Sequence, residues 1–363
     1  MIINFLIIIQ GRMKKYDKKS ADQKREEIEN NVQELLKNTL KEYHSNPELF
    51  AEAFAFSCNF YQYSPLNTQL IYAQNKGATY CQSYSAWKKM GYNVLSGQHG
   101  LKVRIPIHTT WLKINNEEFV KLSEATAAQK EAYQKGMIEG FEKLSFGIGN
   151  VFDISQTDFP KDQYPKLFNM GYPSAQHLNI CRGIEDFASE QLHCPVLQSN
   201  LKSISLRGVY LPEINVIKIN ERLEDTQRLC TTLHELGHAL IHSEKLSRNN
   251  PVLQKELEAD ALSIMIQANY GLELTEARKM HFKNHYDSFI ETLKGTDKDP
   301  FTEIDSIFKS VFHSYKEHIE SINDYVFNRI NLNIENHHSL QPKMNDKSLH
   351  IKQSKHQKIS IDR

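Results

Sequence analysis

The chain has 363 residues, of which 24% are charged and 40% hydrophobic, and its lysines and arginines balance its aspartates and glutamates. This composition is typical of a globular protein, and the length is sufficient for two domains that each bury a core. A net charge of zero argues against a generally basic nucleic-acid binder, so the local distribution of charge matters more than the sum.

The first ten residues, MIINFLIIIQ, are apolar, but the run is too short to span a bilayer and its positive residues follow it. We treat residues 1–13 as an extension, and a translation start at Met13 is an alternative to Met1. The apolar run is therefore not expected to attach the chain to a membrane. The five cysteines are scattered and form no CxxC pair, which favours a reducing cytoplasm.

Residues 14–50 are charged and carry apolar residues at helical spacing, which predicts a packing helix. Between Ala53 and Asn116 the chain has no Asp or Glu but many basic and aromatic residues. A surface without acids that offers aromatic rings suits single-stranded nucleic acid. The alternative is a small domain whose aromatic residues form its core.

Within this region, helices are predicted near residues 67–75 and 83–90, followed by a glycine-punctuated hairpin and a strand over 101–106. Alternation places Lys102 and Arg104 on one face of that strand. The candidate DNA contacts are polar, basic and aromatic: Asn67, Gln74, Tyr80, Trp87, Lys88, Lys89, Lys102 and Arg104.

The run from Asn67 to Pro106 is similar to the N-terminal domain of ArdC-type antirestriction and LtrC-like proteins of mobile elements. The matching positions are Asn67, Gln74, Ala78, Thr79, Trp87, Gly91, Gly97, Gly100, Lys102 and Pro106, whereas Asn75-Lys76 stands where proline is common. GIGNVFDISQT, residues 147–157, resembles the end of that domain. The resemblance implies a single-stranded-DNA-binding domain over residues 14–157.

Residues 117–144 are rich in alanine and charge and are predicted to be helical, as an insertion or an arm. Residues 158–173 contain three prolines and are predicted to be the linker between two domains. Two β-rich runs follow, at 208–210 and 216–219, separated by turn-forming residues. Tyr210, in the first run, could donate a hydrogen bond to an oxyanion, although a strand tyrosine is more often a packing residue.

The pentapeptide HELGH lies within a run whose leucines recur at helical spacing, so His234 and His238 project from one face of a helix. Two such imidazoles can bind one Zn²⁺ ion, and a catalytic zinc needs a third protein ligand and an open position for water. Glu235 is placed to take a proton from that water. His242, one turn further, is predicted to be a polar residue that closes the helix.

A second helix is predicted between Asn250-Pro251 and Tyr270-Gly271, and it contains ELEAD. Glu256 and Asp260 share one face of it, whereas Glu258 points to nearly the opposite side. We predict Glu256 as the third ligand, with Asp260 as the acceptor for the second N–H of a ligand histidine. Glu258 is the reserve candidate for the ligand.

HELGH followed by ELEAD resembles the zincin metallopeptidases, and TTLHELGHALIH with KELEADALS is most similar to the ImmA/IrrE branch. The resemblance covers residues 174–271 and implies peptide hydrolysis by a zinc-polarised water. It also implies that an edge strand before the HELGH helix pairs with the substrate, and we assign that role to residues 216–219.

Two more helices are predicted, over 275–294 and 302–328, and residues 331–363 are predicted to be a disordered, histidine-rich tail. The sequence therefore predicts a cytoplasmic α+β protein with a DNA-binding domain and a mainly helical zincin domain, residues 174–330, with a short sheet. Its expected partners are single-stranded DNA and a protein or peptide substrate, in mobile-element transfer or antirestriction. Two alternatives stay open: a non-enzymatic DNA shield whose zinc site is structural, and a regulatory protease that cleaves a repressor.

Overall fold

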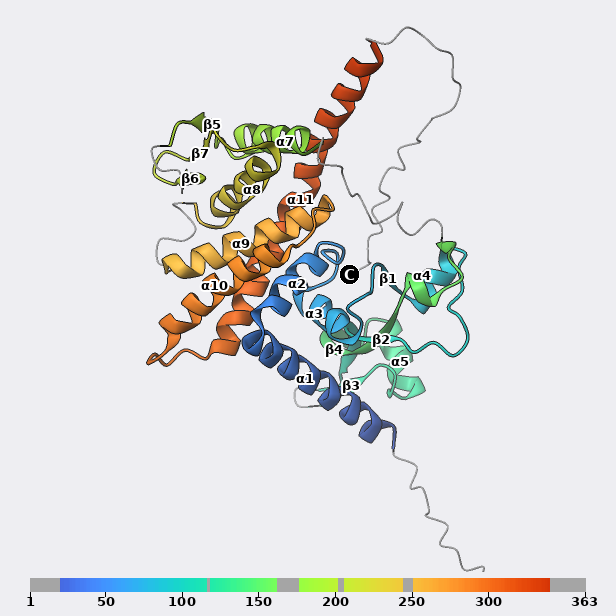
Figure 1. Cartoon of the computed structure of the whole chain (residues 1–363). Coiled ribbons are helices and arrows are strands. Elements are labelled where there is room, and N and C mark those ends of the chain that lie inside the picture. Colours follow the sequence, from blue (N-terminus) through green and yellow to red (C-terminus); the bar gives the residue numbers. More distant parts are fainter. Residues whose placement is uncertain (1–19, 116–117, 162–175, 202–205, 244–250, 340–363) are drawn as a thin grey trace, which may run out of the picture.

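The computed structural model describes residues 20–115, 118–161, 176–201, 206–243 and 251–339 (Figure 1). Its N-terminal elements are α1 (Ala21–Ser45), α2 (Pro47–Ser57), α3 (Pro65–Gln74), β1 (Cys81–Ser83), α4 (Tyr84–Lys89), β2 (Leu101–Lys113), β3 (Phe119–Lys121), α5 (Ala127–Gln134), β4 (Glu139–Asp153) and the 3-10 turn η1 (Ile154–Gln156). The later elements are α7 (His177–Gln191), β5 (Val196–Ser199), β6 (Gly208–Leu211), β7 (Val216–Asn220), α8 (Asp225–Ile241), α9 (Val252–Asn269), α10 (Glu276–Leu293) and α11 (Pro300–Ser339). The predicted α+β class, with a mainly helical second half, is confirmed.

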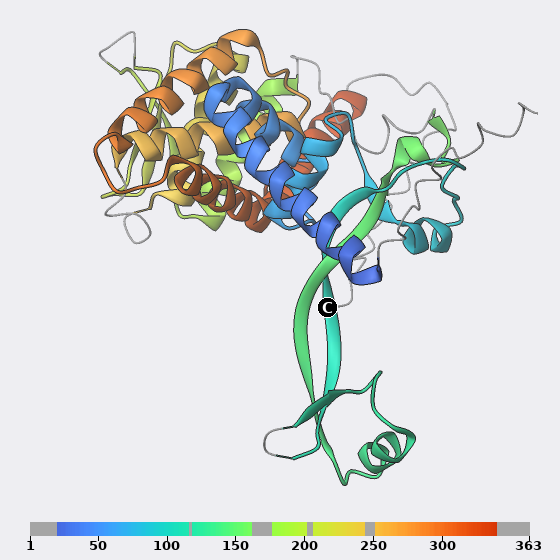
Figure 2. The same cartoon turned by 90° about the horizontal axis from the view of Figure 1, so that it is seen from below.

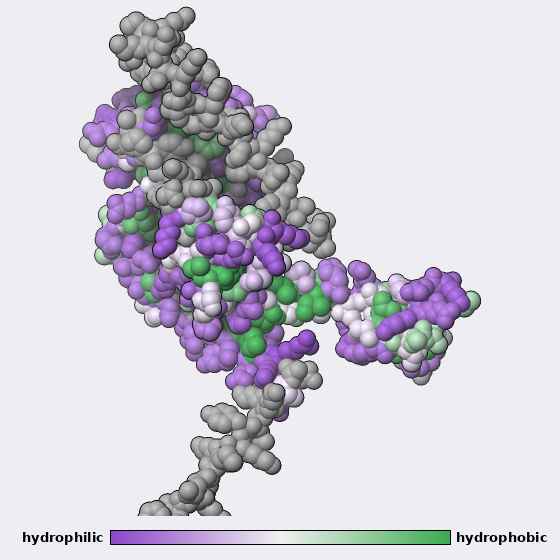
Figure 3. Space-filling model, turned by 90° about the vertical axis from the view of Figure 1, so that its right-hand side faces the viewer, coloured by the Kyte–Doolittle hydropathy of each residue, from purple (hydrophilic) through white to green (hydrophobic). Residues whose placement is uncertain are grey.

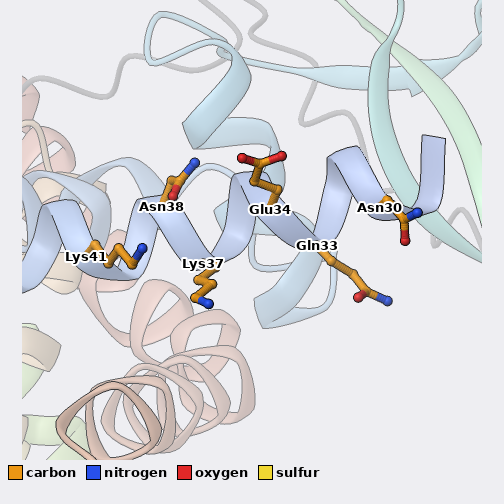
Figure 4. Close-up of a pocket in the computed structure, with 6 residues that line it drawn as sticks. All are labelled: Asn30, Gln33, Glu34, Lys37, Asn38 and Lys41. Atoms are coloured by element: carbon orange, nitrogen blue, oxygen red, sulfur yellow. The ribbon is translucent and has the colours of Figure 1, made fainter. Parts of the chain in front are cut away.

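The predicted helix over residues 14–50 is two helices, because Pro47 disfavours helical backbone at Asn46. Asn46 ends α1 and its side chain accepts a hydrogen bond from the first turn of α2. One face of α1 packs through Val32 and Tyr43. Another face is polar and lines a surface hollow with Asn30, Gln33, Glu34, Lys37, Asn38 and Lys41 (Figure 4).

A long two-stranded ribbon leaves the body of the protein, with β3 and α5 at its far end (Figure 2). Its strands β2 and β4 pair antiparallel from Leu101–Val151 to Lys113–Glu139. The helix predicted over residues 117–144 is therefore wrong except for α5, since the flanking segments pair as strands. Apolar side chains are exposed along the ribbon where it leaves the body (Figure 3): Ile105, Ile107, Leu144 and Phe146.

The main hydrophobic core joins both ends of the chain. Phe50 and Phe54 of α2 pack against Phe282 of α10 and Phe308 of α11, with ring centroids 5.2–6.2 Å apart. The same core includes buried residues of α7, α8 and α9. Helix α2 thus supports the helices that follow residue 176, and the predicted division at residues 158–173 stays a prediction.

The predicted ends of the later helices are confirmed by glycines in the left-handed region, Gly271 (φ +69) after α9 and Gly295 (φ +78) after α10. Helix α11 continues to Ser339, so residues 331–339 are helical where a disordered tail was predicted. The extension 1–13, most of the linker and the rest of the tail lie outside the described residues. No described helix is both long and apolar enough to cross a bilayer.

Candidate metal centre

His234 and His238 lie one turn apart on α8, whose opposite face is fixed in the core by Leu229, Leu233 and Leu236. The Nε2 atoms of the two histidines are 3.3 Å apart. Their side chains are 17% and 14% exposed, so they are open to solvent from one side. The helical spacing predicted from the sequence thus brings two imidazole nitrogens to one point.

Glu256 of α9 completes this group. Its carboxylate oxygens lie 3.4 Å from Nε2 of His234 and 3.6 Å from Nε2 of His238. Metal–ligand bonds of about 2.0 Å in a tetrahedral site place neighbouring donors about 3.3 Å apart, so the three side chains fit one zinc-sized ion. The two imidazoles also lower the pKa of Glu256 through hydrogen bonds, which favours the anionic form that binds metal.

The close approach of α8 and α9 depends on Gly237, between the two histidines. A Cβ atom there would lie 2.9 Å from the carbonyl oxygen and 3.0 Å from the Cα of Ala259, both in the backbone of α9. The absence of a side chain allows the two helices to cross at this point. The Gly in HELGH is therefore part of the geometry that brings Glu256 to the histidines.

Substitution of Gly237 by Ala is expected to destabilise the protein. The higher helix propensity of Ala would contribute about 1 kcal/mol of stability, but overpacking against backbone costs about 1–3 kcal/mol and should outweigh it. Thermal unfolding should show a lower midpoint, together with weaker metal binding because α9 is displaced. An unchanged or raised midpoint would mean that the crossing of α8 and α9 adjusts without cost.

The other ring nitrogen of His234, Nδ1, lies 3.0 Å from Oδ1 of Asp260, whose side chain is fully buried. Burial alone would raise the pKa of Asp260, but the charge of Arg278, hydrogen bonds from His234 and His281 and the close contact of His285 hold that pKa well below its usual range. Asp260 is thus an anionic acceptor that fixes the ring of His234. The sequence predicted this contact between Asp260 and His234, but it did not predict the further contacts of Asp260 with α10.

Behind His238 lies a second chain of contacts. Nδ1 of His238 is 3.1 Å from Nδ1 of His242, and Nε2 of His242 is 2.8 Å from Glu258. His242 and Glu258 are both buried, and Gln254 donates to the other oxygen of Glu258. Glu258 therefore supports the histidines from behind and does not point to the cluster, so the reserve assignment of Glu258 as ligand is wrong. Sequence reasoning missed this role of His242, which the third histidine at i+4 spacing could have signalled.

Glu235 is buried against the small sheet formed in the order β5-β7-β6. A Cβ atom on Gly208 of β6 would lie 3.0 Å from the Cγ and an oxygen of Glu235, and the backbone N–H of Tyr210 donates a hydrogen bond to this carboxylate. Burial raises the pKa of Glu235, an effect that the two imidazoles oppose. A carboxylate with a raised pKa next to the cluster suits a group that accepts and returns a proton.

The phenol of Tyr210 faces elsewhere. Its ring belongs to a small core with Ile217 and Ala239, and its hydroxyl donates to Asn215 at 3.0 Å. Burial raises the pKa of this phenol to about 12. The oxyanion role stays a prediction, and it requires the hydroxyl to leave Asn215.

The strand next to Glu235 is β6, at the edge of the sheet, whereas β7 is central and pairs on both sides. The assignment of residues 216–219 as the substrate-pairing edge is therefore wrong. β6 is the described strand whose free edge lies beside the proposed proton acceptor.

Asn67 and Gln74, two predicted DNA contacts, are used inside the protein. Asn67 exchanges two hydrogen bonds, of 2.7 and 2.8 Å, with the backbone of Arg104, and Gln74 exchanges two, of 2.8 and 2.9 Å, with the backbone of Lys102. These amides satisfy the outer edge of β2 and attach it to α3. These hydrogen bonds explain the presence of the two amides without a role in DNA binding.

Trp87 is 1% exposed and its Nε1 donates to the carbonyl of Phe152, so its predicted role in base stacking is wrong. Tyr80 is half-buried beside Trp87. Arg104 forms an ion pair with Glu29 of α1, and Lys102 donates to Asn150. The basic residues of a region whose own sequence lacks acids are thus paired with an acidic group and an amide group from distant segments.

Lys88 and Lys89 remain as exposed cations on α4, and Tyr84 on the same helix is 56% exposed. Lys88 and Lys89 are thus the fully exposed members of the predicted set of DNA contacts, and Tyr84, which was not in that set, lies exposed beside them.

Comparison with known proteins divides the chain in two. Residues 18–143 match the N-terminal domain of the anti-restriction factor ArdC, and residues 189–293 match the IrrE N-terminal-like domain of the M78 peptidases. Both resemblances seen in the sequence are thereby confirmed.

One similar protein is the uncharacterized protein pXO2-81 of Bacillus anthracis, which is 26% identical over 283 residues; the match covers 73% of this chain and 47% of the relative. The chain therefore spans about half the length of this curated relative. Among solved structures, the metal-free ArdC protein from the R388 plasmid is 14% identical, with a TM-score of 0.40 over 73% of this chain and 86% of that one. Its Mn(II)-bound structure is 15% identical, with a TM-score of 0.36 over 78% and 97%.

Proposed function

We propose that this chain, which joins an ArdC-type N-terminal domain to an IrrE-like peptidase domain, hydrolyses peptide bonds in a metal-dependent reaction. The observation that carries the proposal is the convergence of His234, His238 and Glu256 on one point, with the buried carboxylate of Glu235 beside it. Two imidazoles and a carboxylate with one side open to solvent are the donor set of a catalytic zinc site.

A zinc ion bound there would polarise a substrate carbonyl and lower the pKa of a water molecule. Glu235 accepts the proton of the attacking water at a carboxylate oxygen and returns it to the leaving amine. The hydrogen bond from the backbone of Tyr210 orients this carboxylate. Asp260 and the His242–Glu258 pair hold the two imidazoles with Nε2 directed to the cluster.

Substrate backbone can pair with the free edge of β6, since that strand contacts Glu235 through Gly208. We expect an extended segment of a protein or peptide, and we assign the reaction to the cytoplasm because all five cysteines are free.

The test is metal-dependent cleavage of a peptide library, with new peptide ends identified by mass spectrometry. Protein stripped with a chelator should be inactive, and added Zn²⁺ should restore cleavage, because the water is acidic enough only at a metal. Cleavage that persists in the stripped protein would contradict the proposal. So would the absence of cleavage in protein that elemental analysis shows to be zinc-loaded, which would favour the non-enzymatic DNA shield.

A second function, single-stranded DNA binding, is favoured by the match of residues 18–143 to the ArdC domain and by the exposed Lys88, Lys89 and Tyr84. We propose that these α4 side chains contact phosphates and a base. Such binding would place the peptidase beside transferred DNA in antirestriction or mobile-element transfer.

A Lys88→Glu/Lys89→Glu variant should bind a labelled single strand more weakly. Each phosphate contact on single-stranded DNA contributes about 0.7 to the slope of log K against log salt, so the slope should fall by about 1.4. Fluorescence anisotropy across a salt series measures it. Lys316→Glu, an exposed position on α11, is the matched control. An equal slope in the two variants would exclude α4 as the DNA surface.

A further inference from the structure

A second group of metal-binding side chains lies on the other side of Asp260. His281 and His285 are one turn apart on α10, and Nδ1 of each lies 2.9 Å from the same carboxylate oxygen, Oδ2 of Asp260. Their ring centroids are 4.4 Å apart. Two histidines at i and i+4 with a carboxylate from a neighbouring helix repeat the arrangement of the first cluster.

The two oxygens of Asp260 divide between these groups. Oδ1 faces His234, at 3.0 Å, and Arg278, at 2.8 Å, whereas Oδ2 faces only the two histidines of α10 among the described residues. Asp260 can therefore hold the ring of His234 with one oxygen and act as a ligand with the other. The two functions do not compete for the same atom.

Hydrogen bonding alone leaves this group incompletely satisfied. Nδ1 of His285 is buried, and within the described part of the chain it makes no hydrogen bond, although Oδ2 is close. A cation between the three atoms would satisfy both nitrogens and the oxygen together. The side chain of His281 is 51% exposed, which gives an ion a route from solvent.

We propose that Asp260, His281 and His285 form a second site for a divalent transition-metal ion. Two imidazoles and one carboxylate suit Zn²⁺ and its neighbours, and exposure of His281 leaves positions for water. The positive charge of Arg278 makes this site weaker than the one at His234, His238 and Glu256. Because Asp260 also orients His234, binding at the second site is coupled to the first, so the level of free metal can adjust the peptidase.

The test uses a His234→Ala/His238→Ala variant, in which the first site has lost two ligands and the second is intact. Full-length protein is dialysed against a series of Zn²⁺ concentrations, and bound zinc per chain is measured by elemental analysis. The variant is expected to bind one zinc ion, and further substitution of His281 and His285 by Ala should remove it. His313→Ala, an exposed histidine on α11, is the matched control and should retain it.

The proposal is overturned if the double variant binds no zinc, or if loss of His281 and His285 leaves the amount of bound zinc unchanged. A second readout does not depend on removal of the α10 histidines. In the His234→Ala/His238→Ala variant, Zn²⁺ should protect His281 from diethyl pyrocarbonate, as measured by mass spectrometry, and equal modification with and without Zn²⁺ contradicts the site. Neither result depends on peptide cleavage, so failure of the proposed peptidase activity would be recognised separately.

Discussion

Replacement of Glu235 by Gln is expected to lower the rate of peptide cleavage by about 10²–10⁴-fold, the usual contribution of general acid–base catalysis. Gln keeps the volume and can still accept the hydrogen bond from the backbone of Tyr210, but it cannot take a proton from water. Because the three metal-binding side chains are unchanged, zinc content should equal that of the wild type. Cleavage kinetics and elemental analysis on the same preparation measure both quantities.

Glu221→Gln provides the control, since this exposed carboxylate precedes α8 and lies outside the cluster. It should leave the rate unchanged. If Glu235→Gln cleaves as fast as the wild type, the proton is accepted elsewhere and the mechanism is wrong. If neither protein cleaves while both keep zinc and protect DNA from restriction, the metal site is structural and the protein acts by occupying DNA.

The convergence of His234, His238 and Glu256 could be predicted from sequence because the spacing that produces it is local. His234 and His238 share a helical face by periodicity alone, and Glu256 with Asp260 does so on the next helix. The crossing of α8 and α9 at Gly237 then brings the two faces together. The choice between Glu256 and Glu258 rested on which side of α9 each residue occupies, and the geometry agrees with Glu256.

The β2–β4 ribbon could not be predicted in the same way. Residues 139–144 belong to a segment that was predicted to be helical, but they pair with residues 108–113 of β2, 26 to 36 positions earlier in the chain. Gly147 and Gly149 assist this pairing, because a Cβ at either would meet the side chain of Ile107 or Ile105. Local propensity is overridden where a distant strand supplies the hydrogen bonds.

The DNA surface shows a related limit of composition. Asn67, Gln74 and Trp87 match the ArdC pattern, yet their side chains hold β2 and β4 in place. Amide and indole groups required by the fold cannot be distinguished by composition from groups that bind a ligand. Only burial and hydrogen-bond partners separate them, and these depend on the tertiary fold.

The contacts behind His238 predict a large effect from a residue that cannot reach the metal. Glu258→Gln is expected to weaken zinc binding by about 10–100-fold, the usual effect of removing a carboxylate that supports a ligand histidine. The carboxylate of Glu258 accepts a hydrogen bond from Nε2–H of His242. Nδ1 of His242 in turn accepts a hydrogen bond from Nδ1–H of His238. An amide accepts this hydrogen bond more weakly and can also present its NH₂ group to His242, which disfavours the required tautomer.

Competition with a chromophoric zinc chelator measures the dissociation constant, and cleavage at saturating zinc measures the rate separately. Affinity should fall more than the saturated rate, because Glu258 orients a ligand and does not touch the substrate. Gln254→Ala is the matched variant, since it removes the neighbouring hydrogen bond to Glu258 but keeps the charge. It should change affinity much less. Equal affinities in Glu258→Gln and the wild type would mean that His238 is held by its helix alone and that the buried His242–Glu258 pair serves only the packing of α8 on α9.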